Sequence, residues 1–408
     1  MKRQEKAQKK TEYILSIVLC GVLAGLTLYL SYQQAFHAWN GLEEYHSDVL
    51  AYMQEVKGIA SGYSFPYPIM FWMIRLMHFL LPIEWAVAIV LTVLQCTSFL
   101  LLRYYIQKFL RRAASVEKSG WQQALASLAA FGALFYSMIF VYNHPMPGLR
   151  FYYMGVFSPN PFHNATYIAS RPFCITSFFM FADLLEYYEE RLELRKALAF
   201  GVVLLLATMT KPSFTIVFCG AAGLIMVCRL FKCRFCNWKN TLLLGCAFIP
   251  TFLDLLYQFG GVFSGVDSKG EEAGIGFGLF KVWTEYCDNY FMAILLLIFF
   301  PLAVLIFQYR KIFTHTIYRF GWQMYGMGLV MFILLYEKGF RRVDANFSWG
   351  YMLGAFFLVV SSLCVLLEET CKADSHSWKL LIQWAAFGMH VACGLIYFLI
   401  IFTGGSYY

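Results

Sequence analysis

The chain has 408 residues, of which 60% are hydrophobic, 19% are aromatic and 14% carry a charge. This composition excludes an ordinary soluble protein or a disordered chain and is typical of an integral membrane protein. The net charge of +8 does not indicate a nucleic-acid partner, because most basic residues lie in short clusters between apolar stretches, as the positive-inside rule predicts for cytoplasmic loops.

The first apolar stretch, residues 13–31, follows several lysines and is longer than a signal-peptide core, so we expect a retained membrane span. Further along, the basic clusters cover residues 2–10, 103–118, 191–196, 229–239, 310–319 and 372–379. If all of them face the cytoplasm, the apolar stretch 67–82 cannot cross the membrane. Pro66, Pro68 and Arg75 also make it a poor span, so we predict a partly embedded surface helix there.

The sequence then predicts an all-α polytopic membrane protein that forms one integral membrane domain over residues 1–408. We expect about eleven spans, at residues 13–31, 84–103, 121–142, 171–187, 196–210, 213–230, 240–257, 289–307, 318–336, 349–367 and 378–402. The first span precedes an outer loop, 32–83, and the other ten spans lie within 84–402. This predicts a multi-pass protein of the cell membrane, with a cytoplasmic N-terminus, an extracytoplasmic C-terminus and its longest loops outside.

The first outer loop carries an acidic cluster that includes Glu43, Glu44 and Asp48. Residues 48–60 place apolar side chains at helical spacing, which predicts a second surface helix that begins at Asp48. Aspartate is a favoured N-cap residue, so one interpretation is a helix cap. The other is a functional carboxylate at the membrane surface, where a charge without a use is rare.

The order of these features resembles the GT-C superfamily of polytopic membrane glycosyltransferases, which includes mannosyltransferases and aminoarabinose transferases. The shared features, mainly over residues 1–230, are Asp48 after the first span, the proline pair Pro66 and Pro68, the basic connector 103–112 and a lysine-proline turn at Lys211. Two departures are Val49 after Asp48, where many relatives have glutamate, and Pro-Tyr-Pro-Ile in place of Pro-Pro-Leu.

The resemblance implies transfer of a hexose or pentose, with inversion, from a polyprenyl-phosphate-linked donor to a glycan, lipid or protein acceptor on the outer face of the membrane. It gives Asp48 the role of catalytic base, or of ligand to a divalent metal such as Mg²⁺ or Mn²⁺. His46, two residues earlier, is expected either to assist Asp48 or to be a solvated loop histidine. The expected partners are the donor, the acceptor and membrane lipids.

A lipid-phosphate donor needs cations on the same side of the membrane. Arg341 and Arg342 are candidates because guanidinium groups fit phosphate oxygens and this loop is expected outside. The alternative is local pairing with Glu337 or Asp344. Lys211 is a further candidate, with a snorkelling lysine as its alternative.

Polar and aromatic residues also gather in segment 158–167, where His163 and Asn164 could read sugar hydroxyls or form a turn before the next span. Arg75 could contact lipid headgroups or the substrate. Cys233 and Cys236 form a C-x-x-C pair without the second ligand pair that a zinc site needs.

Two other functions compete with a transferase. A cell-surface polysaccharide polymerase would rely on the outer arginine pair, and a lipid or glycan transporter (a flippase) would carry matched halves with broken helices and ionisable groups near the middle of the membrane.

Overall fold

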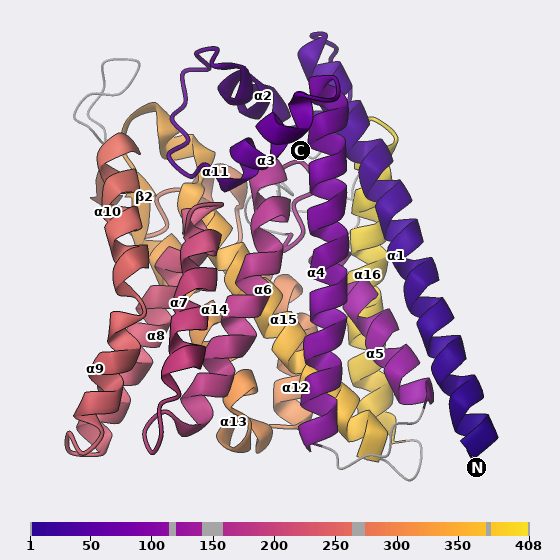
Figure 1. Ribbon diagram of the computed structural model, residues 1–408, viewed down its shortest axis with the longest axis vertical. Coiled ribbons are helices and arrows are strands. Elements are labelled where there is room, and N and C mark those ends of the chain that lie inside the picture. The colour runs from indigo at the N-terminus through magenta and orange to yellow at the C-terminus, as the bar shows by residue number, and fades with distance from the viewer. Residues whose placement is uncertain (1, 114–119, 141–157, 263–273, 373–376, 407–408) are drawn as a thin grey trace.

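The computed structural model describes residues 2–113, 120–140, 158–262, 274–372 and 377–406, which form a helical bundle with one two-stranded ribbon (Figure 1). The helices are α1 (Lys2–Trp39), α2 (Val49–Lys57), α3 (Ile69–His78), α4 (Ile83–Ala113), α5 (Gly120–Ala133), α6 (Ala165–Tyr187), α7 (Leu194–Thr208), α8 (Pro212–Lys232), α9 (Trp238–Cys246), α10 (Ile249–Val262), α11 (Trp283–Tyr286), α12 (Tyr290–Phe307), α13 (Lys311–Thr314), α14 (Thr316–Leu334), α15 (Asn346–Lys372) and α16 (Trp378–Phe402). Strand β1 (Ile275–Phe277) pairs antiparallel with β2 (Leu335–Glu337), and a 3₁₀ turn, Gly339–Asp344, follows β2.

Seven of these helices are long and apolar enough to cross a membrane: α1, α4, α6, α8, α12, α15 and α16. Helices α9 and α10 meet at a bend of 46° and together make an eighth candidate. Within the described residues the structure is therefore an all-α bundle of seven or eight candidate spans, which is consistent with a multi-pass membrane protein.

Each of the eleven expected spans falls on a helix or on the bent pair, but the count of eleven is not shown. Helices α5 and α7 have only 14 and 15 residues, fewer than the roughly 20 that a span needs. Helix α14 has 19 residues, yet it carries Arg319, Gln323 and several aromatic polar residues, and it does not pass as a candidate span. Apolar periodicity predicts a helix more reliably than it predicts that the helix spans the bilayer.

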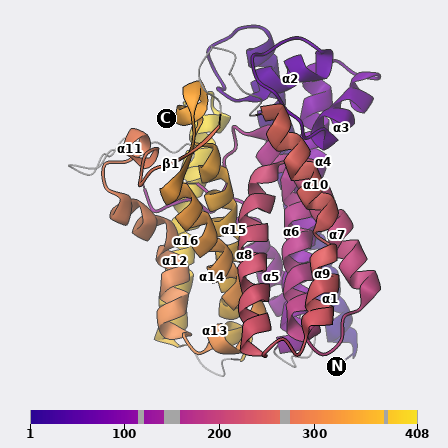
Figure 2. The same ribbon diagram turned by 90° about the vertical axis from the view of Figure 1, so that its left-hand side faces the viewer.

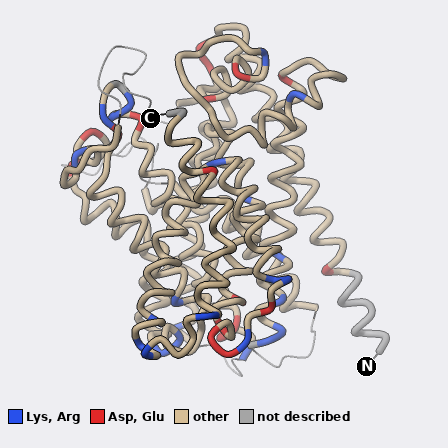
Figure 3. Tube along the Cα trace, turned by 60° about the vertical axis from the view of Figure 1, so that its left-hand side comes forward, with Lys and Arg blue, Asp and Glu red and all other residues tan. Residues whose placement is uncertain are grey.

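The two surface helices expected in loop 32–83 are α2 and α3, and they lie at the same end of the bundle (Figures 1 and 2). Helix α3 has ten residues, which is about 15 Å, or about half of the hydrocarbon thickness. Most Lys and Arg residues gather at the opposite end, near α13 and the chain N-terminus (Figure 3). The helices therefore run between an α2–α3 end and a basic end.

Helix α15 is the centre of the bundle, and the most apolar stretch of this candidate span is entirely buried inside the protein. It packs on α14, α8, α12, α5 and α4. Glycines allow the closest approach to α14, because a Cβ on Gly354 would lie 3.1 Å from Met324 O and one on Gly328 would lie 3.0 Å from Tyr351 Cα. Small residues at such contacts are the usual way in which membrane helices pack, since lipid offers no hydrophobic driving force.

An even closer contact joins α16 to the chain after α5. A Cβ on Gly394 would lie 1.5 Å from the carbonyl oxygen of Phe135. One turn earlier, His390 hydrogen-bonds Ser137 O through Nδ1 at 2.6 Å and receives the amide of Phe300 through Nε2 at 3.2 Å. The imidazole thus joins the backbone after α5, at Ser137, to the backbone of α12, at Phe300.

We predict that Gly394→Ala destabilises the protein, because the new methyl group would collide with backbone that cannot move without breaking the His390 contacts. The expected loss is about 2 kcal/mol or more, in the range for forced overpacking. Thermal unfolding of the purified protein in detergent would measure it. Gly388→Ala, on the same helix with nothing within 4 Å of the added Cβ, is the matched control and should unfold as wild type does. Equal unfolding temperatures for the two variants would contradict the prediction.

Candidate functional site

The site begins at the first turn of α6, where Asn164 is the N-cap. Its side-chain oxygen accepts hydrogen bonds from the backbone amide of Tyr167 at 2.9 Å and from the hydroxyl of Thr166 at 2.9 Å. Asparagine is among the best N-cap residues because this geometry satisfies an amide that has no helical partner. The cap fixes which way the side chain faces, since the oxygen must point at the helix and the NH₂ group must point away from it.

The side-chain amide of Asn164 also bridges Asp48 and Lys211. Its nitrogen donates to Asp48 Oδ2 at 2.6 Å and to the Tyr52 hydroxyl at 3.2 Å, and its oxygen accepts from Lys211 Nζ at 3.2 Å. Residues more than one hundred positions apart thus meet on a single side chain. The sequence analysis singled out Asp48, Asn164 and Lys211 separately, and the structure brings all three together.

Asp48 lies at the start of α2, but its side chain makes no capping hydrogen bond. The amide of Asp48 donates instead to His163 O at 3.2 Å, which anchors the acidic loop to the start of α6. The half-buried carboxylate therefore faces Asn164 and a cavity. Of the two interpretations of Asp48, the side-chain cap is wrong, and the carboxylate is free to act as an acceptor of protons.

Lys211 lies in the tight turn between α7 and α8, immediately before Pro212 at the first position of α8. The turn is tied to the proline pair, because the Met209 carbonyl accepts the amide of Ile69, the first residue of α3, at 3.1 Å. The side chain of Lys211 is only 5% exposed. Its Nζ donates to Thr166 Oγ1 at 3.0 Å and lies 4.6 Å from the centre of the Trp349 ring.

In the described part of the chain Lys211 has no direct ion pair. Burial lowers the pKa of Lys211 to about 8, while the negative charge of Asp48 acts in the opposite direction. A buried ammonium held by neutral oxygens and an aromatic face attracts an anion strongly, because little else compensates its charge.

A cavity of about 880 Å³ opens in front of these groups. Asp48, Asn164 and Lys211 line one side of it, and Arg341 and Asp344 line another. Its volume falls in the range of small-molecule binding sites. The described lining thus brings three carboxylates, Asp48, Glu285 and Asp344, together with the cations Lys211 and Arg341.

A second, mainly apolar groove of about 380 Å³ adjoins this cavity between α8 and α10. Its apolar lining includes Ile216, Phe252, Leu255 and Phe259, and it shares Tyr67, Lys211, Arg341 and Asn346 with the cavity. Cationic groups therefore lie where apolar space meets polar space. Such a junction suits an amphiphile whose charged head lies at Lys211 and whose apolar tail lies along α8 and α10.

Both arginines of the expected pair have acidic partners. Arg341 Nε lies 3.1 Å from Glu337 Oε2 and 3.8 Å from Asp344 Oδ2, and Arg342 lies 3.6 Å from Glu285. Only Arg341 lines the cavity and the groove. Local pairing with Glu337 or Asp344, the alternative interpretation, therefore describes Arg341, whereas the partner of Arg342 is the distant Glu285. Arg341 remains close enough to contact a ligand in the cavity.

The remaining predicted site residues lie behind or beside the cavity. His163 is fully buried next to the ring of Trp349, and burial lowers the pKa of His163 to about 4, so the ring is neutral at neutral pH. His46 is exposed and does not line the cavity. Arg75 donates to the carbonyl oxygens of Val56 and Glu55 at 3.3 and 3.4 Å, which fastens α3 to the last turn of α2.

Three residues of the site were not predicted: Trp349, Tyr52 and Tyr67. Trp349 supplies the aromatic face next to Lys211 but lies in the expected span 349–367, where the sequence gives no sign of a site. Tyr52 is on the buried face of α2 and hydrogen-bonds Asn164. Tyr67, the middle residue of the Pro-Tyr-Pro motif, lines both the cavity and the groove. The two prolines that flank it were the sequence feature that could have indicated Tyr67.

The divalent metal considered for Asp48 has little support from its surroundings. Among the described residues no group of three or more His, Cys, Asp or Glu side chains could hold a metal ion. Asp48 Oδ2 already accepts the Asn164 amide. The donor set around Asp48 thus does not fit a cation held by protein ligands alone, because such sites gather several oxygen ligands.

Compared with known proteins, the chain matches no protein-family model and no curated protein.

We predict that anion binding at Lys211 weakens as the pH rises above about 8. The ammonium is charged below its pKa and neutral above it, so affinity should fall toward about tenfold per pH unit once the pKa is passed. Isothermal titration with dodecyl phosphate would measure this, since an alkyl phosphate no longer changes charge in that range. Lys211→Arg keeps its charge and should give a flat profile. A flat profile for wild type would contradict the prediction.

Proposed function

We propose that this protein is a membrane glycosyltransferase that moves a sugar from a polyprenyl-phosphate-type lipid to a glycan, lipid or protein acceptor. The reaction takes place in the cavity at the α2–α3 end, and this end faces the extracytoplasmic side of a cell membrane. The observation that carries the proposal is the Asn164 amide, which holds the Asp48 carboxylate and the Lys211 ammonium in one cavity that adjoins an apolar groove.

Asp48 suits the acceptor side of such a reaction, and Lys211 suits the leaving phosphate. Asp48 takes the proton from an acceptor hydroxyl as that oxygen attacks the anomeric carbon of the donor. The bond between this carbon and the phosphate oxygen breaks, and the polyprenyl phosphate leaves with the electron pair. Lys211 and Arg341 stabilise the negative charge that grows on the phosphate. Attack from the face opposite the phosphate inverts the anomeric centre.

Asn164 holds the side chains of Asp48 and Lys211 in position for the proposed reaction. Its NH₂ group donates a hydrogen bond to Asp48 Oδ2, and its oxygen accepts one from the Lys211 ammonium. A direct ion pair would engage Asp48 and Lys211 with each other, whereas an amide between them leaves each side chain able to contact the substrate. No step is assigned to a metal ion.

Charge distribution supports the proposed orientation. Lys and Arg residues gather at the end opposite α2 and α3 (Figure 3), and such clusters are retained in the cytoplasm. The resemblance to GT-C enzymes rests on the order Asp48, proline pair, basic connector and lysine-proline turn. In the structure Asp48, Lys211 and Tyr67, which lies between the two prolines, line one cavity. This convergence favours a transferase over a transporter, whose ionisable groups would lie near mid-membrane.

The polymerase alternative receives less support. It relies on both outer arginines at one site, whereas Arg342 is paired with Glu285 and lines neither the cavity nor the groove.

Replacing Asp48 by Asn should reduce sugar transfer by about 10²- to 10⁴-fold, because the amide cannot accept the acceptor proton. The assay measures consumption of polyprenyl-phosphate hexoses by the protein reconstituted in vesicles. Dodecyl phosphate binding should be retained, since Lys211 is unchanged.

Glu43→Gln is the matched control, because Glu43 is an exposed carboxylate of the same loop and does not line the cavity. Its turnover should equal that of wild type. Full turnover by the Asp48→Asn variant would exclude the proposed base. Movement of the lipid across the vesicle membrane without a covalent product would identify a transporter.

A further inference from the structure

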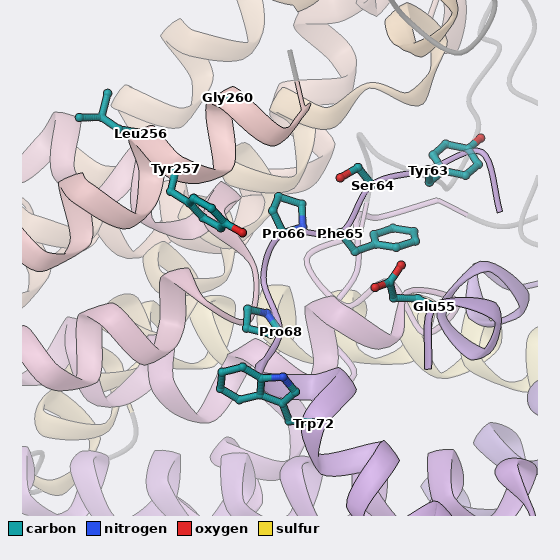
Figure 4. Close-up of a pocket in the computed structure, with 10 residues that line it drawn as sticks. All are labelled: Glu55, Tyr63, Ser64, Phe65, Pro66, Pro68, Trp72, Leu256, Tyr257 and Gly260. Carbon is teal, nitrogen blue, oxygen red and sulfur yellow. The ribbon is translucent and has the colours of Figure 1, made fainter. Parts of the chain in front are cut away.

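A separate cavity of about 860 Å³ lies across segment 63–68 from the candidate site (Figure 4). Its walls come from that segment, from α2 and α3, and from the end of α10. Tyr63 and Phe65 line both this cavity and the candidate site. We call it the outer cavity, and the shared residues make segment 63–68 a wall between the two.

The side chains of the outer cavity are aromatic and hydrogen-bonding rather than cationic. Tyr63, Trp72 and Tyr257 contribute three rings that are 43%, 53% and 72% exposed. Glu55 and Ser64 add a carboxylate and a hydroxyl, and among the described residues that line the cavity there is no Lys or Arg. In Figure 4 the hydroxyl of Tyr257 points toward the proline pair, Trp72 lies below Pro68, and the carboxylate of Glu55 points toward Phe65.

The part of this lining that the structure describes is unsuited to a phosphate, since its one charged group, Glu55, is an acid. It also differs from the groove between α8 and α10, which supplies mostly aliphatic and phenylalanine side chains. Flat rings beside a carboxylate and hydroxyl groups match a neutral sugar, which offers C–H faces for stacking and hydroxyls for hydrogen bonding. An aromatic belt at the membrane surface would place rings toward lipid, whereas these rings line one hollow together with Glu55.

The wall is held in place by packing on both sides. Phe65 contacts the rings of Tyr52, Tyr67 and Phe71 at centroid distances of 5.2, 5.9 and 5.5 Å. Arg75 binds the Glu55 carbonyl at 3.4 Å and so sets the distance between α2 and α3. Arg75 is therefore a positioning residue for the outer cavity, through the backbone that it fastens.

We propose that the outer cavity binds a neutral oligosaccharide, the acceptor end of a growing glycan, whose terminal hydroxyl reaches Asp48 past segment 63–68. This rests on the proposed transferase function and selects a glycan from the three acceptor classes. The acceptor then lies in the outer cavity and the lipid donor in the α8–α10 groove, which adjoin one another at Ser64 and Leu256.

The experiment is binding of the purified full-length protein, in detergent, to a printed array of neutral oligosaccharides. Wild type should bind members of the array, and Trp72→Ala and Tyr257→Ala should each weaken binding about tenfold, a loss in keeping with one aromatic contact. Both rings are more than half exposed, so neither change should unfold the protein. Tyr257→Phe, which keeps the ring, should lose less than Tyr257→Ala.

Trp85→Ala is the matched control, because Trp85 is 41% exposed on α4 near the same end of the bundle and does not line the cavity. It should bind as wild type does. If wild type binds no array member, or if Trp72→Ala binds as well as Trp85→Ala, the inference is overturned. Weakened dodecyl phosphate binding by Trp72→Ala without oligosaccharide binding would assign the cavity to lipid and would also overturn it.

The outcomes separate this inference from the proposed function. Loss of transfer in Asp48→Asn with no oligosaccharide binding by wild type would leave the transferase and remove the glycan cavity. Oligosaccharide binding that depends on Trp72 and Tyr257, together with full turnover by Asp48→Asn, would leave a glycan-binding cavity and remove the proposed base.

Discussion

The candidate site depends on one side-chain amide. Asn164 can present its nitrogen to Asp48 and its oxygen to Lys211 only because capping α6 fixes the orientation of the amide. The cap is a local preference of the helix, worth about 1 kcal/mol in most proteins, yet here it sets the geometry of two charged groups on distant segments. Loss of the cap would free the amide to rotate, and the acid and the base would no longer share a fixed partner.

The bundle brings these segments together through contacts between backbones. The Met209 carbonyl receives the first amide of α3, and the His163 carbonyl receives the amide of Asp48. Each bond satisfies a group at a helix end that has no helical partner. Unsatisfied backbone groups are costly near a bilayer, so these bonds fix the start of α3 to the end of α7 and the start of α2 to the start of α6. The cavity lies where these helix ends converge.

The sequence predicted the helices far better than it predicted their roles. Apolar periodicity located a helix at every expected span, and the prolines before Ile69 correctly ended the loop ahead of α3. Helices α5, α7 and α14 were also expected to span the membrane but are not among the candidate spans, because α5 and α7 are short and α14 carries polar residues. Among the site residues, composition and position indicated Asp48, Asn164 and Lys211, but Trp349 could not be distinguished from other tryptophans of a span.

By itself the sequence determined a membrane-type composition, a helical chain and the segregation of basic residues into connectors, because these follow from local hydropathy and charge. It also marked which polar residues were unusual for their surroundings. Only the tertiary structure decided that three of these residues share one hydrogen-bonded cluster, that the two arginines are paired with acids, and that segment 63–68 separates two cavities. Distances between segments more than one hundred residues apart depend on how whole helices pack, and no local pattern in the chain encodes them.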